Sequence, residues 1–155
     1  MSKPTIVFVP GSYVLLTFYE RFFHGLTEAG YDIKGVHPPS VGTSSRQGRD
    51  GPAPSMYEDA RAIAQEVEKH ADLGRDVILM GHSYGGVPMS QSTKGLGKQE
   101  RKGQGKLGGI IQLAFITCLV PRMGGSAATL LSSLPNNDRP AISMDVSSYL
   151  QDRHL

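Results

Sequence analysis

The most informative stretch of the sequence is Val77-Ile78-Leu79-Met80-Gly81-His82-Ser83-Tyr84-Gly85-Gly86. Its apolar beginning is typical of a strand that is buried on both faces of a parallel sheet. The Gly-x-Ser-x-Gly pattern that follows predicts a sharp, strained turn at Ser83, with a helix just beyond it. Gly81 and Gly85 approach each other closely in such a turn, where larger side chains would clash. The alternative is that the two glycines only make a tight turn and that Ser83 caps the helix.

Strand and helix patterns alternate along the rest of the chain. Short β-branched or apolar runs predict strands at 5–9, 31–37, 76–80 and 110–117. Helical spacing predicts helices at 17–29, 55–71, after Ser83 and at 127–134. Thr17 with Glu20, and Ser55 with Glu58, have the spacing of capping boxes. This order predicts an α/β fold, a three-layer αβα sandwich with a mostly parallel sheet of about four strands.

Composition and charge narrow the class of protein. The 155 residues fit one domain, and the net charge of +2 gives no argument for a nucleic-acid partner. No apolar run is long enough to span a membrane, and the N-terminus has no signal-peptide pattern. The single cysteine, Cys118, suits a reducing compartment, and no His or Cys pair has the spacing of metal ligands. We therefore expect a cytoplasmic protein with no metal, no cofactor and no nucleic-acid partner.

Two serines follow strands at the same edge of the predicted sheet. Ligands of such sheets bind beyond the carboxyl ends of the strands, where Ser12 and Ser83 both lie. Acyl transfer needs two N–H donors for the oxyanion. The candidates are two backbone N–H groups. One belongs to Tyr84, directly after Ser83, and the other to Ser12, in the loop after the first strand. The alternative for Pro10-Gly11 is a plain turn.

Three stretches resemble the α/β-hydrolase superfamily, in its branch of small esterase-like and lipase-like proteins. They are residues 7–12, 37–44 and 77–86, and the third is the specific one. The resemblance implies a serine hydrolase of carboxylic esters or similar small acyl substrates, with Ser83 as nucleophile in an elbow of Gly81, His82 and Gly85. The first stretch has Pro10 where many relatives carry His, but the backbone donor does not depend on that side chain.

The resemblance covers the chain to about Pro121. We expect residues 1–121 to form a partial hydrolase core, and residues 122–155 to form an incomplete cap segment or a loose tail. In the family the acid and then the histidine follow the nucleophile. His154 is the only histidine after Ser83, and Asp138, Asp145 and Asp152 are the acids nearby. His154 is the candidate base, and Asp138 or Asp145, with Asp145 preferred, is the candidate acid, although no strand is expected to hold Asp145 or His154.

The strands that carry the acid and the histidine in the family are not predicted in this chain, and this leaves alternatives open. The chain is expected to be a truncated member of the family or one half of a catalytic unit. A non-catalytic relative would bind a small molecule or a partner chain, and the fourth strand would be an exposed edge open to self-association. The fold could also host other chemistry, such as a cofactor-independent lyase.

Two further features have structural interpretations. Cys118 is expected to be inert, late in a buried strand. Five basic residues among glycines predict a solvated loop rather than an anion site. They are Lys94, Lys98, Arg101, Lys102 and Lys106.

Overall fold

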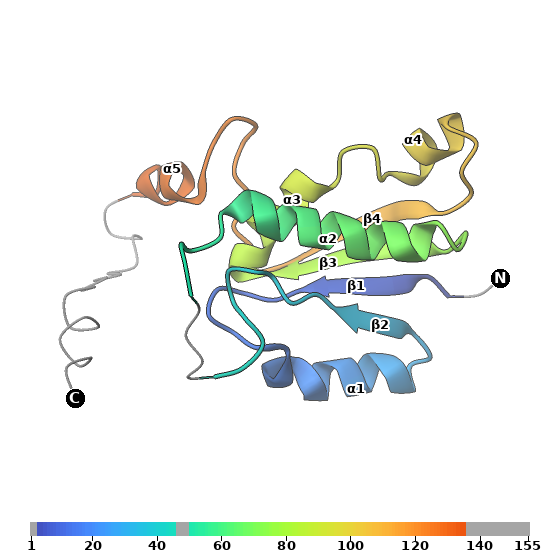
Figure 1. Cartoon of the computed structure of the whole chain (residues 1–155), viewed down its shortest axis with the longest axis horizontal. Helices are drawn as coiled ribbons and strands as arrows, with labels where there is room; N and C mark the ends of the chain where they lie inside the picture. Colours follow the sequence, from blue (N-terminus) through green and yellow to red (C-terminus); the bar gives the residue numbers. More distant parts are fainter. Residues whose placement is uncertain (1–2, 46–49, 136–155) are drawn as a thin grey trace.

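A four-stranded parallel sheet forms the centre of the computed structural model, which describes residues 3–45 and 50–135 (Figure 1). The strands are β1 (Thr5–Val9), β2 (Asp32–Gly35), β3 (Asp76–His82) and β4 (Gly109–Ile116). Their order across the sheet is β2-β1-β3-β4, and every pairing is parallel. The predicted fold class is confirmed, and its sheet has the four strands expected.

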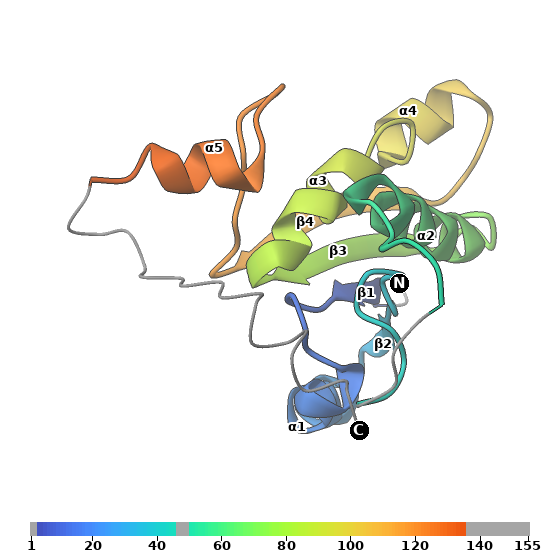
Figure 2. The same ribbon diagram turned by 60° about the vertical axis from the view of Figure 1, so that its left-hand side comes forward.

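Helices cover both faces of this sheet (Figure 1). The helices of the described residues are α1 (Glu20–Glu28), α2 (Met56–Ala71), α3 (Gly86–Ser92), α4 (Lys98–Gly103) and α5 (Ala127–Ser132). Helix α1 lies on one face, and α2 and α3 lie on the other. Helix α5 stands away from the sheet in both views (Figure 2). In the part of the chain that is described, no helix has both the length and the apolar character to cross a membrane.

Two apolar layers hold the helices on the sheet. On one face, strand residues such as Val7 and Leu79 belong to the same buried cluster as Ile63, Val67 and Met89 of the helices. Each such side chain stabilises the fold by about 1.5–3 kcal/mol.

On the other face, the ring of Phe8 packs against an aromatic cluster. Its centroid lies 4.6 Å from that of Tyr19, 5.7 Å from that of Phe22 and 5.2 Å from that of Phe23. Both faces of β1 are therefore covered, as the all-apolar run of this strand predicts.

The start of the first helix differs from the prediction. A 3-10 helix over Leu16–Tyr19 precedes α1, so Thr17 lies inside a helical turn and caps nothing. A 3-10 turn advances the chain by 120° per residue instead of 100°, which changes the buried side. Tyr19 is consequently buried. Phe18, whose helical spacing with Phe22 and Leu26 predicts a place on the apolar face, is instead 76% exposed. The second predicted box is present, since the Ser55 N–H donates to the Glu58 carboxylate over 2.7 Å.

The basic segment after α3 is not the solvated loop that its composition suggests. It forms α4, whose Arg101 is almost fully buried and donates from Nε to the Gly108 carbonyl over 2.8 Å. Arg101 Nη2 also donates to the Asp72 carboxylate over 2.6 Å, and Lys98 pairs with Asp76 over 2.7 Å. These contacts order the segment against the start of β3 and β4.

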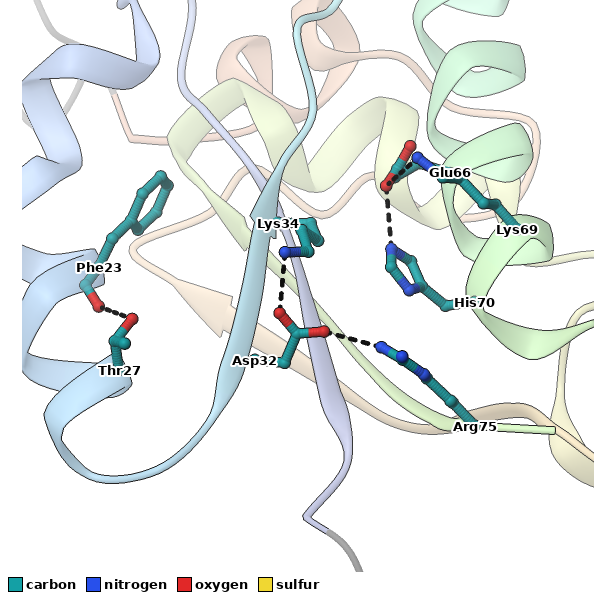
Figure 3. Close-up of polar contacts among 8 residues, drawn as sticks. All are labelled: Phe23, Thr27, Asp32, Lys34, Glu66, Lys69, His70 and Arg75. Carbon is teal, nitrogen blue, oxygen red and sulfur yellow. Dashed lines mark hydrogen bonds and ion pairs between the residues drawn. The ribbon is translucent and has the colours of Figure 1, made fainter. Parts of the chain in front are cut away.

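The parallel strands give the sheet two different edges. We call the carboxyl edge the one where Val9, Gly35, His82 and Ile116 end the strands, and the amino edge the opposite one. At the amino edge Asp32 lies between two cations and accepts bonds from Lys34 and Arg75, each over 2.9 Å (Figure 3). The hydrogen bond from Lys34, followed by the charges of Lys34 and Arg75, lowers the pKa of Asp32.

Candidate active site at the carboxyl edge

Ser83 occupies a strained turn where β3 passes into a helix. The strand runs two residues further than predicted, to His82, and Ser83 then adopts a positive φ of 52° before α3 begins at Gly86. A residue other than glycine seldom adopts such a φ, and the cost is borne by the surrounding structure. The Leu119 N–H donates to the Ser83 carbonyl over 3.0 Å and so anchors the turn from the segment after β4.

Glycines allow the backbone to crowd around this turn. A Cβ on Gly85 would lie 2.6 Å from the Pro10 carbonyl oxygen and 2.7 Å from that of Val9. A Cβ on Gly81 would lie 3.3 Å from the carbonyl carbon of Gly85. Since these neighbours are backbone atoms that cannot swing aside, a side chain at Gly85 would push the turn away from β1.

The loop after β1 lies directly beside Ser83. A Cβ on Gly11 would be 3.3 Å from Ser83 Cβ and 3.2 Å from His82 Nδ1. The Gly11 N–H donates to the Tyr19 hydroxyl over 3.1 Å, and that hydroxyl hydrogen-bonds His82 Nδ1 over 2.8 Å. The His82 ring thus faces the α1 side of the sheet, where it helps to fix the loop that carries Ser12.

A cavity of about 330 Å³ opens next to this loop. Its lining is made of small or neutral side chains: Ser12, Tyr13, Ser40, Val41, Ala53, Pro54 and Tyr84. Tyr13 has a positive φ of 58° and is largely exposed. The volume lies at the lower end of the range for small-molecule sites.

A buried carboxylate stands behind this cavity. Asp59 has no exposed surface, and it accepts bonds from the Ser40 N–H over 2.9 Å, the Ser40 hydroxyl over 2.6 Å and the Tyr84 hydroxyl over 3.0 Å. Burial, and then the negative charge of Asp59, raise the pKa of Tyr84 to about 12. The phenol therefore stays neutral through the physiological range.

The sequence interpretation missed Asp59, although a signal for it exists. Asp59 lies four residues before Ile63 and eight before Val67, which places it on the buried stripe of α2. An acidic residue on such a stripe must have polar partners. Tyr57, whose helical spacing with Ala60 and Ala64 predicts a place on the apolar face of α2, is instead 62% exposed.

A second cavity, of about 470 Å³, lies on the α1 side of the sheet. Its lining is mostly aromatic and includes His82: Phe8, Phe18, Tyr19, Arg21, Phe22, His82 and Ile116. Neither Ser12 nor Tyr84 belongs to it, so it is separate from the cavity at the loop after β1.

Cys118 does not lie in a buried strand. It follows β4 by two residues, is half-buried, and donates from Sγ to the Gly81 carbonyl over 3.0 Å. Burial raises the pKa of the Cys118 thiol, which disfavours the reactive thiolate. Among residues 3–45 and 50–135, no cluster of three or more acidic, histidine or cysteine side chains could hold a metal ion.

The structure brings together Ser12, Gly81, His82, Ser83, Tyr84 and Gly85, the candidates from the loop after β1 and from the elbow. The candidate acids and base, Asp138, Asp145, Asp152 and His154, lie outside the described residues.

Comparison with known proteins places this geometry in a family context. Residues 6–152 match the sequence pattern described as the alpha/beta hydrolase family. The alpha/beta hydrolase nvfD of Aspergillus novofumigatus is 31% identical over 126 residues, which cover 81% of this chain and 47% of that protein. The probable hydrolase R7 of a Phoma species is 32% identical over 126 residues, with the same coverage. The chain thus spans about half the length of the curated relatives it matches.

A solved structure gives the same picture of the fold. An extracellular alpha/beta-hydrolase from a Paenibacillus species superposes with a TM-score of 0.56 at 16% identity. The superposition covers 84% of this chain and 49% of that one, and that protein is described as sharing structural and functional homology with tobacco salicylic acid binding protein 2. At this identity the likeness concerns the fold alone.

Proposed function

The chain belongs to the α/β-hydrolase family, and we propose that it is a serine hydrolase that acts through Ser83 on carboxylic esters or similar small acyl substrates. The observation that carries the proposal is the backbone at Ser83. A nucleophile elbow is supported by the φ of 52° at Ser83 between β3 and α3, by the tight surroundings of Gly81 and by the lack of room for a side chain at Gly85.

The proposed reaction begins with attack of Ser83 Oγ on the carbonyl carbon of the substrate. A new C–O bond forms, the hydroxyl proton passes to a base, and the carbonyl oxygen becomes an oxyanion. Backbone N–H groups of Ser12 and Tyr84 are the proposed oxyanion donors, which is supported by the close approach of Gly11 to Ser83. The oxyanion then collapses, the alcohol leaves with a proton, and water hydrolyses the acyl-enzyme.

Two sources of the base are compatible with the order of residues in the family. One is His154 with Asp145, both after Ser83 in this chain. The other is a histidine and an acid in the part of the hydrolase fold that the alignment with the relatives does not cover. A His154→Ala variant tests the first source, since loss of the wild-type activity would assign the base to this chain.

The cavity next to Ser12 favours small, neutral substrates. Its volume is about 330 Å³, its described lining carries no charged side chain, and the neutral Tyr84 phenol forms one wall. We propose that residues 122–135, including α5, begin a cap over the carboxyl edge, because the chain leaves the sheet after β4 and α5 stands away from the sheet (Figure 2).

The test compares hydrolysis of short-chain p-nitrophenyl esters by the wild-type chain, Ser83→Ala and the control Ser90→Ala. Ser90 lies on α3, the helix after the elbow, and its hydroxyl bonds the Gly86 carbonyl. We expect Ser83→Ala to lose about 10³-fold or more of the activity and Ser90→Ala to keep it. Equal turnover by the wild type and Ser83→Ala would refute the assignment.

A second candidate is a non-catalytic member of the family that binds a partner or a second copy of itself. The observation that favours it is β4, an outer strand whose Ile111, Leu113 and Phe115 are each about 40% exposed or more in the described chain. Unpaired outer strands with apolar side chains favour association. Sedimentation that shows a concentration-independent monomer would exclude self-association through β4.

We also propose a cytoplasmic location. The support is the half-buried free thiol of Cys118, which suits a reducing compartment. Fractionation of cells that produce the chain with a C-terminal tag tests this proposal.

A further inference from the structure

The surroundings of Asp59 set it apart from the acids that meet cations at the amino edge. It lies in the first turns of α2, fully buried, and the donors around it among the described residues are neutral: one backbone N–H and two hydroxyl groups. A buried carboxylate without a cation is costly unless each oxygen is hydrogen-bonded. Its place in the fold therefore depends on Ser40 and Tyr84.

The two partners of Asp59 come from different segments of the same cavity wall. Ser40 belongs to the loop after β2, and Tyr84 directly follows Ser83. Both line the cavity of about 330 Å³. A single oxygen, Asp59 Oδ2, accepts both hydroxyl groups, over 2.6 Å from Ser40 and 3.0 Å from Tyr84. The Asp59 carboxylate thus links the loop after β2 to the turn that contains Ser83.

Tyr84 transmits this anchoring to the backbone beside Ser83. Its phenol oxygen is fixed on Asp59, and its backbone lies in the 3-10 turn Ser83–Gly85. A side chain that is held at both ends leaves little freedom for the peptide between Ser83 and Tyr84. This peptide carries the N–H that is the proposed second oxyanion donor.

We propose that Asp59 is a positioning residue of the hydrolytic site, which clamps Tyr84 and Ser40 and so fixes both the substrate wall and the Tyr84 backbone N–H. The inference rests on the proposed function of Ser83. Asp59 touches neither substrate nor reacting atoms, and it acts through Tyr84.

The test measures how fast a fluorophosphonate probe reacts with Ser83 in four variants of the full chain. Asp59→Asn removes the charge but keeps the shape, Tyr84→Phe removes only the hydroxyl, and the double variant combines both changes. Glu68→Gln changes an exposed acid on the same helix and is the matched control. The concentration dependence of labelling separates the maximal rate constant from probe binding, and the labelled fraction and the melting temperature report folding.

The clamp predicts that Asp59→Asn and Tyr84→Phe each lower the maximal rate constant by about 10-fold, as small misplacements of reacting groups do. The double variant should be no slower than the slower single variant, because both changes break the same link. Glu68→Gln should keep the wild-type rate. A merely structural role would reduce the labelled fraction or the melting temperature and leave the rate constant of the labelled molecules unchanged, and this outcome would overturn the proposal.

A spectroscopic readout checks the clamp without any chemistry at Ser83. With ¹³C-labelled tyrosine and a Tyr84→Phe spectrum to assign the signal, the Tyr84 phenol of the wild-type chain should titrate with a pKa of about 12, and this titration should move toward 10 in Asp59→Asn. An unmoved titration would overturn the clamp. Absence of labelling in the wild type would instead overturn the assignment of Ser83, whereas normal labelling with an unaffected Asp59→Asn overturns the clamp alone.

Discussion

The two edges of the sheet hold their acidic side chains in different ways. At the amino edge several acids meet cations, as Asp32 meets Arg75 and as Asp72 meets Arg101. At the carboxyl edge Asp59 is buried and meets hydroxyl groups and an amide. Backbone strain is also found at the carboxyl edge. The described non-glycine residues with positive φ are Tyr13, Ser83 and Thr117, and all three lie beyond the carboxyl ends of strands.

We interpret this difference as one between groups that secure the fold and groups that would prepare the proposed site. Ion pairs with exposed acids are screened by water and contribute at most about 1 kcal/mol each. A buried carboxylate with neutral partners and a strained serine are costly to keep, and such costs gather where geometry serves chemistry. The carboxyl edge is therefore where the function is expected, and changes at the two edges should have different consequences.

The largest effect is expected from Gly85→Ala at the carboxyl edge. The new Cβ would lie 2.6 Å from a backbone oxygen of Pro10, so the elbow must move. We expect a loss of about 3 kcal/mol in the free energy of unfolding, measured by urea denaturation, together with loss of Ser83 labelling. Gly25→Ala in α1, where a Cβ meets nothing within 4 Å, should instead gain about 0.5–1 kcal/mol. Equal stability of the two variants would contradict this account of the elbow.

Arg101→Met should destabilise the amino edge without affecting the site. The variant keeps the apolar stem but leaves the buried Gly108 carbonyl without its Nε donor. We expect a loss of about 2 kcal/mol, with the Ser83 labelling rate unchanged. Lys102→Met on the exposed side of the same helix serves as the control. A slower labelling rate in folded Arg101→Met would break the separation between the two edges.

Tyr84 should make the stability fall at high pH. Its folded-state pKa of about 12 lies above the ordinary value of 10, so the folded state holds the proton more tightly than the unfolded state. The contribution of Tyr84 to the free energy of unfolding is complete below pH 10 and is lost as the pH rises to 12. After allowance for screening by solvent, the loss is about 1 kcal/mol. It is measured as the stability difference between the wild type and Tyr84→Phe, which should shrink over this interval. A constant difference would contradict the raised pKa of Tyr84.

Asp32→Asn should have the smallest effect. The lowered pKa of Asp32 means that its contribution is present above about pH 4 and is lost as the pH falls below its lowered folded value. Because the carboxylate is 40% exposed, we expect less than about 0.5 kcal/mol at pH 7 and less again in high salt. Chemical denaturation at pH 7 and pH 3 provides the measurement, and a loss above 2 kcal/mol would show that this ion pair is not screened.

The local parts of the architecture could be predicted from the sequence. The strand Thr5–Val9 has the predicted bounds, because a short β-branched, apolar run that ends at Pro10 favours a buried strand, and all five of its residues are buried. The Gly-x-Ser-x-Gly pattern predicts the turn at Ser83 because only glycine fits the crowded backbone there.

Features that depend on contacts between distant segments could not be predicted. Asp59 meets Ser40 and Tyr84, which lie 19 and 25 residues away in the sequence. Helix α4 could not be predicted for the same reason. Its basic, glycine-rich composition suggests a loop, and the contact of Arg101 with the distant Asp72 helps to order it as a helix. A single turn of 3-10 helix at Leu16–Tyr19 buries Tyr19 in the core and leaves Phe18 exposed.

The most direct test of the central claim is the location of a fluorophosphonate adduct on the purified chain by peptide mass spectrometry. The account predicts that Ser83 carries the adduct and that Ser83→Ala abolishes labelling. A chain that stays unlabelled, or an adduct that persists in Ser83→Ala, would contradict the claim that the strained serine at the carboxyl edge is the nucleophile.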